Sequence, residues 1–134
     1  YHAPCIDGAT AALVASIYFE RSLHVDPLDR GRVSWHPMKV FLPPEDQFDV
    51  SSVGAEDEVF LLDYAGNEGF LRALAARAKW VGVLDHHATL VTALGGAASA
   101  VAGLPANLYL ELDVQRSGAT IALDYFSQQM DRDA

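Results

Sequence analysis

The sequence predicts an α/β domain built on an open, mainly parallel sheet of about five strands, with helices on both faces. Segments of β type alternate with segments of helical periodicity along the chain, which is typical of a parallel sheet covered by helices. The apolar runs at 59–62 and 80–84 are short and unbroken, as in strands buried on both faces. The 134 residues, 51% of them hydrophobic, fit one domain with a single core.

The first third of the chain is expected to contain two strands and one helix. Residues 1–2 would end a first strand, a helix would span 8–22, and the alternation over 32–42 predicts a second strand. The apolar positions of that helix are Ala9, Ala12, Leu13 and Ile17. The proline pair at 43–44 then breaks regular structure and begins an acidic loop, which we interpret as a solvated surface.

The rest of the chain is expected to alternate strand and helix three times. The predicted strands are 59–62, 80–84 and 107–112, and the helices after them are 67–79, 89 to about 102, and a last one capped by Ser117. The buried stripe expected on the last helix consists of Ala119, Ala122, Leu123, Phe126 and Met130.

Composition limits the classes of function. A net charge of −9 disfavours a surface that coats long duplex nucleic acid, because affinity for phosphates comes largely from Lys and Arg. The single cysteine, Cys5, excludes an intrachain disulfide and a zinc site with several cysteines. Without a stretch of roughly 18 uncharged apolar residues or a secretory leader, we expect no membrane partner and a cytoplasmic location.

Ligand-type residues follow three of the predicted strands. They are His2 with Asp7 just beyond it, then Asp63, then Asp85-His86-His87. In open parallel sheets, sites form beyond the carboxyl ends of the strands, so these groups should meet in one place. Carboxylate and imidazole together suit manganese, iron, cobalt or zinc, and a bound ion would offset the repulsion between neighbouring acids.

The order and spacing of these groups resemble the DHH phosphoesterase superfamily over nearly the whole chain. The segments that carry the resemblance are Tyr1–Gly8, Leu62-Asp63, Val83–His87 and Arg116–Ala119. The first motif, His, four residues and Asp-Gly, is most similar to the branch that includes nanoRNases and cyclic-nucleotide phosphodiesterases. Asp-His-His alone arises by chance, whereas four ordered motifs at strand ends form a specific pattern.

The resemblance implies a role for each matching residue. His2 and Asp7 match ligands of one Mn²⁺, and Asp63 matches the carboxylate that bridges two ions. His86 matches a further metal ligand, with Asp85 beside it as a ligand or supporting catalytic group, and His87 matches the catalytic histidine that contacts the scissile phosphate. Mg²⁺, Co²⁺ or Zn²⁺ would also suit such a site. The expected substrate contacts are His87, Arg116, Ser117 and Gly118.

The residues also allow plainer interpretations. Asp7 or Asp63, taken alone, could simply cap a helix, and Arg116 could be a solvated helix-start arginine. Cys5 lies within the first motif and could be either a metal ligand or an inert packing group. Ala9 stands where many superfamily members carry a second carboxylate, which predicts that one metal is held more firmly than two.

These observations together predict a manganese-dependent phosphoesterase domain, a hydrolase that cleaves a small phosphodiester by metal-activated water. The expected substrate is a short oligonucleotide or a cyclic nucleotide. Because the chain opens on Tyr1 and the superfamily's C-terminal substrate-binding domain does not follow, residues 1–134 are interpreted as the catalytic fragment of a longer protein. The alternatives are a degenerate DHH domain that binds nucleotide or a protein partner without turnover, and a ligand-binding α/β domain with incidental histidines.

Overall fold

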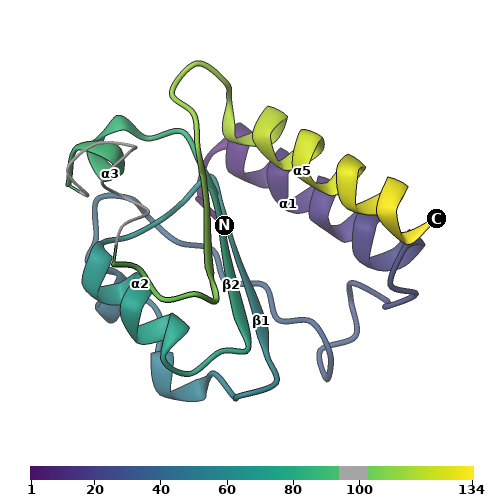
Figure 1. The fold of residues 1–134 in the computed structure, drawn as a ribbon, viewed down its shortest axis with the longest axis horizontal. Coiled ribbons are helices and arrows are strands. Elements are labelled where there is room, and N and C mark those ends of the chain that lie inside the picture. Colours follow the sequence, from purple (N-terminus) through teal and green to yellow (C-terminus); the bar gives the residue numbers. More distant parts are fainter. Residues whose placement is uncertain (94–102) are drawn as a thin grey trace.

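The computed structural model describes residues 1–93 and 103–134 and shows an open parallel sheet with helices packed against it (Figure 1). The strands are β1 (Glu58–Leu62), β2 (Trp80–Asp85) and β3 (Leu108–Leu112), in the order β1-β2-β3 with both pairs parallel. The helices are α1 (Ile6–Arg21), α2 (Glu68–Ala75), α3 (Ala88–Ala93) and α5 (Gly118–Asp133), with short 3-10 turns at Pro44–Asp46 and Val50–Ser52. The predicted α/β class with a parallel sheet is therefore confirmed.

The predicted number of strands is wrong for the described part of the chain, where the sheet has three strands instead of five. Residues 1–2 and 32–42 form one isolated parallel bridge, between His2 and Met38, and no strand of the described sheet. Beyond this bridge, the N-terminal amine of Tyr1 donates to the carbonyl of His36 at 2.9 Å. The N–H of His2 still donates to the carbonyl of Leu62 at 3.1 Å, so this segment runs beside the end of β1.

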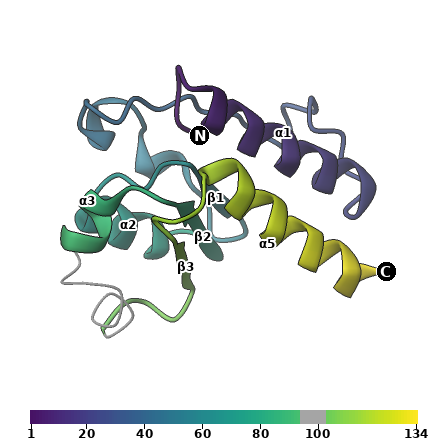
Figure 2. The same ribbon diagram turned by 90° about the horizontal axis from the view of Figure 1, so that it is seen from above.

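The sheet has a hydrophobic cluster on each face. On one face Leu61, Val81 and Val83 pack with α2 and with the segment before β1. On the other face Leu62 and Leu84 pack with α1 and α5, which lie side by side (Figures 1 and 2). Neighbouring residues of a strand point to opposite faces, so each short apolar run fills both clusters.

The buried face of α1 differs from the predicted apolar positions, whereas the predicted stripe of α5 is confirmed at Ala122 and Phe126. In α1 the buried residues are Gly8, Ala11, Ala15 and Tyr18, and in α5 they are Gly118, Ile121, Ala122 and Phe126. Leu123, predicted to be buried, and Leu13, an apolar position of the predicted first helix, are more than half exposed. Small residues at the contact allow two helix backbones to lie close together, so Ala11 and Ala15 of α1 face α5, and the larger Tyr18 packs against Phe126.

The other predicted helices differ mainly in length. The segment 67–79 forms the shorter α2, capped by the side chain of Asn67, which accepts the N–H of Phe70 at 2.9 Å. The predicted helix from 89 to about 102 begins as α3, and its part over 94–102 lies outside the described residues. No helix in the described ranges is long and apolar enough to cross a membrane.

Candidate metal centre

Two buried aspartates lie side by side at the carboxyl edge of the sheet. Asp63 directly follows β1 and Asp85 is the last residue of β2, and the backbone N–H of Asp63 donates to the carbonyl of Leu84 at 2.8 Å. Each aspartate is only 1% exposed. The parallel pairing of β1 and β2 thus places two carboxylates that are 22 residues apart in sequence at one edge, away from water.

The backbone of Asp63 has a left-handed conformation, with φ at +53°. Few residues other than glycine adopt positive φ, although aspartate and asparagine do so more readily than most. Such a conformation costs free energy and persists where the surroundings hold it in place. Here the turn directs the Asp63 carboxyl group back between α1 and α5, where it meets three other parts of the chain.

Two histidines approach the two oxygens of Asp63. The distance from His2 Nδ1 to Asp63 Oδ2 is 3.1 Å, and the distance from His86 Nε2 to Asp63 Oδ1 is 3.0 Å. Nevertheless, Oδ1 is buried and accepts no hydrogen bond of acceptable geometry from the described residues. His86 Nε2 also lies 3.4 Å from Oδ2 of Asp7, so it stands between two carboxylates.

Burial raises the pKa of Asp63 above its ordinary value, and the nearby charge of Asp7 raises it further. The hydrogen bond with His2 and the charges of His87 and His86 act in the opposite direction. A buried carboxylate with an unpaired oxygen is costly unless a positive charge compensates it. The orphaned Oδ1 therefore fits a site for a cation.

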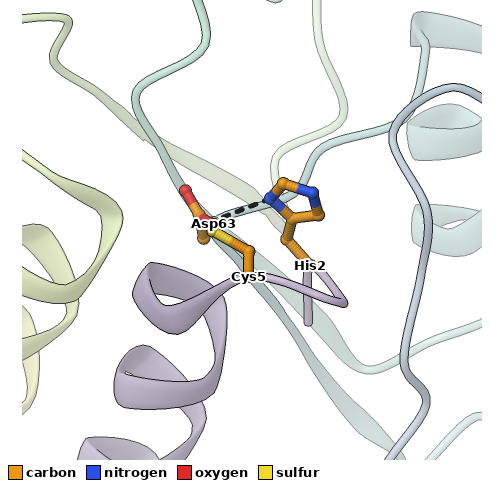
Figure 3. A group of neighbouring side chains, drawn as sticks. All are labelled: His2, Cys5 and Asp63. Atoms are coloured by element: carbon orange, nitrogen blue, oxygen red, sulfur yellow. Dashed lines mark hydrogen bonds and ion pairs between the residues drawn. The ribbon is translucent and has the colours of Figure 1, made fainter.

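The metal-donor atoms form two groups that share Asp63. One group is His2, Cys5 and Asp63, drawn in Figure 3, and the other is Asp63, His86 and His87. In each group the donor atoms lie within 4.8 Å of one another. Imidazole, carboxylate and thiol donors suit borderline divalent ions, so the residues present fit a divalent metal ion.

Asp7 lies beside these groups, but its carboxylate has another partner. Its Oδ2 accepts the N–H of Gly118 at 2.9 Å and its Oδ1 accepts the N–H of Ala119 at 2.6 Å. Asp7 thus caps the start of α5 from the first turn of α1, so it has a capping role, but for a distant helix and not for the next one in the sequence. Gly8 contributes to this joint because a Cβ atom there would collide with the backbone carbonyl of His2.

Sequence reasoning gave Gly8 no role of its own. The only signal was its place directly after Asp7 in the first motif, since a glycine beside a site residue commonly marks a close approach of two backbone segments.

His87 is held by the second buried aspartate. Its Nδ1 lies 2.6 Å from Oδ1 of Asp85, and its ring lies edge-on to that of His2 with 5.6 Å between the centroids. A carboxylate that accepts the Nδ1 proton fixes the tautomer and the orientation of an imidazole, and it leaves Nε2 to act on another group. Asp85 therefore supports His87, and it belongs to neither donor group.

The predicted phosphate contacts after β3 have partners within the chain. The Arg116 guanidinium contacts Asp113 at 2.7 Å, Asp124 at 2.8 Å and Glu111 at 2.9 Å, and hydrogen bonds to these carboxylates raise its pKa. The hydroxyl of Ser117 accepts the N–H of Thr120 at 3.1 Å and caps α5. Since the N–H of Gly118 is also occupied, the geometry gives no support to phosphate binding by these three groups.

Comparisons of the chain with protein-family models, with curated proteins and with solved structures find no match. The geometry of the site therefore carries the functional argument that follows.

Proposed function

We propose that this chain is a metal-dependent phosphoesterase domain that hydrolyses a small phosphodiester, such as a short oligonucleotide or a cyclic nucleotide. The observation that carries the proposal is Asp63, a buried carboxylate shared by two groups of metal-donor atoms and left with one unpaired oxygen. Mn²⁺ is the ion expected from the resemblance to DHH phosphoesterases.

The electrostatics of the site support the need for a cation. Among the described residues, the ion pairs at the edge of the sheet join histidines to Asp7, Asp63 and Asp85, with no Lys or Arg partner. A phosphodiester is itself an anion and would be repelled by these carboxylates. A divalent ion bound by the two donor groups supplies positive charge, Lewis acidity and the activation of a water nucleophile.

The pair of His87 and Asp85 supports a role in the chemistry. With Nδ1 held by Asp85, the other ring nitrogen of His87 is available to a phosphate oxygen, beside the group of His2, Cys5 and Asp63 and in place of a bond from His87 to an ion of the second group. A protonated imidazole in this position would neutralise charge that develops on the phosphate in the transition state. Asp85 keeps the ring in place through its contact with Nδ1.

The charge of the whole chain favours a small substrate. The net charge is −9, and the arginine nearest to the start of α5, Arg116, is engaged by three carboxylates. Binding of a long nucleic acid depends on many free Lys and Arg side chains along the phosphate backbone. One phosphodiester group beside a metal centre does not need them.

A second candidate function is binding without turnover. It is favoured by Asp7, whose two oxygens accept backbone N–H groups of α5, and by Ala9, whose exposed side chain offers no donor. Such a domain would bind a metal or nucleotide, yet lack the ligands that a pair of metals needs for an in-line displacement.

Hydrolysis of bis(p-nitrophenyl) phosphate, and of a dinucleotide, separates these functions. We expect hydrolysis that requires Mn²⁺ and is abolished by a chelator and by Asp63→Asn, with the exposed Asp131→Asn as the matched control. Binding of Mn²⁺ in calorimetry without hydrolysis of either substrate would favour the second function. If Mn²⁺, Co²⁺ and Zn²⁺ all fail to bind, the metal-dependent phosphoesterase is excluded.

A further inference from the structure

The cysteine of the first motif lies at the metal centre. Cys5 is the residue before α1, and its sulfur lies within 4.8 Å of a donor atom of His2 and of Asp63. Figure 3 shows the Cys5 thiol and the His2 imidazole both directed at the Asp63 carboxyl group. Three residues from the end of β1 and from the start of α1 thus present sulfur, nitrogen and oxygen to one place.

Within the described residues, the Cys5 thiol has no capping, disulfide or core-packing role. The residue occupies the N-cap position of α1, but its side chain makes no capping hydrogen bond. It has no disulfide partner, because the chain contains one cysteine, and it is partly exposed instead of being packed in the core. The partial positive charge at a helix N-terminus is also complementary to a thiolate.

A second observation independent of the cysteine points to a ligand here. Asp63, which belongs to the same group, is 1% exposed, and its Oδ1 accepts no hydrogen bond of acceptable geometry within residues 1–93 and 103–134, although His86 Nε2 lies 3.0 Å away. Asp7, the carboxylate that sequence reasoning placed in this ligand set, caps α5 instead. The group therefore contains a buried acceptor that needs a cation. The sulfur of Cys5 can supply the anionic ligand that Asp7 does not provide.

We infer that Cys5 is a metal ligand, and that with His2 and Asp63 it forms a position selective for Zn²⁺ or Co²⁺ over Mn²⁺. This inference rests on the metal centre of the proposed function and specifies its ligands. Thiolate is a soft donor that favours Zn²⁺ and Co²⁺, whereas Mn²⁺ prefers oxygen. Three protein ligands leave a fourth position open, as in catalytic zinc sites. On binding, the thiol proton passes to solvent, so uptake of the ion releases a proton.

The two positions then differ in chemical character. The group of Asp63, His86 and His87 offers only nitrogen and oxygen, and it remains compatible with Mn²⁺. The two groups can be tested separately because Asp63 belongs to both, His2 only to the first and His87 only to the second.

Alkylation of the single cysteine provides a direct test that needs no catalytic activity. Iodoacetamide labelling of the reduced wild-type chain is followed by mass spectrometry with and without Zn²⁺. We expect Zn²⁺ to slow the labelling of Cys5 in the wild type and in His87→Ala, and to have no effect in His2→Ala or Asp63→Asn. Equal labelling rates with and without Zn²⁺ in the wild type would overturn the inference.

Titration with Co²⁺ gives a spectroscopic readout of the same bond. A thiolate ligand produces a sulfur-to-cobalt charge-transfer band in the near ultraviolet, which should be present in the wild type and absent in Cys5→Ser. We expect Cys5→Ser to lower the Zn²⁺ affinity about tenfold or more, with a smaller change for Mn²⁺. Co²⁺ binding without this band would refute ligation by Cys5 and leave the proposed function standing. Absence of any Co²⁺ binding would also refute the Zn²⁺- or Co²⁺-selective position, and the Mn²⁺ titration then decides the proposed function separately.

Discussion

Gly118 lies directly against Asp63, so that a Cβ atom added at residue 118 would stand 2.5 Å from the aspartate's Oδ1. The first residue of α5 thus borders the unpaired oxygen of the candidate metal centre. A glycine is required here by the space that the carboxyl group takes up, and the left-handed turn at Asp63 leaves that group little room to move.

Gly118→Ala is therefore expected to destabilise the protein by about 1–3 kcal/mol and to lower its metal affinity, because the methyl group displaces the Asp63 carboxyl group. Urea unfolding and calorimetric titration measure the two effects. Gly69→Ala, at an exposed position in α2, is the matched control and should stabilise the protein by about 0.5–1 kcal/mol. Unchanged metal affinity in Gly118→Ala would contradict the close packing described for this site.

Asp63→Asn and Asp63→Ala should separate the charge of this side chain from its backbone conformation. Asparagine tolerates positive φ, whereas alanine does so less readily, so Asn should preserve the fold and Ala should lower the stability. Both variants should lose the metal. The measurements are thermal unfolding without metal and Mn²⁺ calorimetry, and metal binding retained by Asp63→Asn would remove Asp63 from the ligand set.

Asp7→Ala is expected to lower the stability of the metal-free protein by about 2–3 kcal/mol, because charge-assisted hydrogen bonds to two backbone N–H groups are lost. The exposed Asp131→Ala, within α5 itself, should change it by less than about 0.5 kcal/mol. Chemical unfolding in the presence of a chelator makes the comparison. A metal-free Asp7→Ala protein as stable as the wild type would show that Asp7 does not anchor α5.

His87→Ala should reduce turnover while metal binding by the group of His2, Cys5 and Asp63 persists. Asp85→Asn should have a similar effect, since it weakens the 2.6 Å contact that orients the His87 ring. Rates of phosphodiester hydrolysis and Zn²⁺ affinities, measured on the same preparations, test this division of roles. Complete loss of Zn²⁺ by His87→Ala would assign that histidine to the ligands of both positions.

Stability at alkaline pH should depend on Tyr18. Its hydroxyl donates to Asp133 Oδ2 at 3.0 Å, and burial, followed by this hydrogen bond, raises its pKa from 10.0 to about 12. The folded state holds the proton more tightly, so the contribution is complete below pH 10 and is lost as pH rises from 10 towards 12.

In Tyr18→Phe the free energy of unfolding should fall less steeply between pH 10 and about 12 than in the wild type. At neutral pH the variant should be less stable by about 1 kcal/mol. Denaturant unfolding at several pH values provides the measurement. Tyr109→Phe is the comparison, because this tyrosine is similarly bonded, to Glu111, but is 41% exposed and should matter less. An equally steep fall in Tyr18→Phe would contradict the assignment.

The sheet was predictable where the sequence contains a short apolar run that ends in a polar group. The runs before Asp63 and Asp85 specify buried parallel strands, and parallel pairing alone brings the two aspartates to one edge. The strand predicted over 32–42 is wrong because alternation shows which residues suit a strand and not whether a neighbouring strand is available to pair with it. This segment forms the isolated bridge at Met38 and no strand of the described sheet.

Periodicity predicted the buried Ala122 and Phe126 of α5 but not the buried face of α1. An alanine-rich helix offers several plausible faces, and the choice depends on how closely the partner helix approaches. Ala11 and Ala15 are buried by α5, while Leu13 remains exposed. The contact of Asp7 with α5 could not be predicted from the sequence, because Gly118, which donates to it, is 111 residues away in the chain.

The joint between Asp7 and Gly118 has a consequence for the time at which the centre forms. During synthesis His2, Asp7, Asp63 and His86 all precede the residues of α5, and contacts between such distant segments form slowly because a long loop must close first. Until α5 docks, the Asp7 carboxylate lacks its backbone donors and Asp63 lacks the neighbour that confines it. We therefore expect the ion to enter a finished domain, so that metal uptake reports the completion of folding instead of nucleating it.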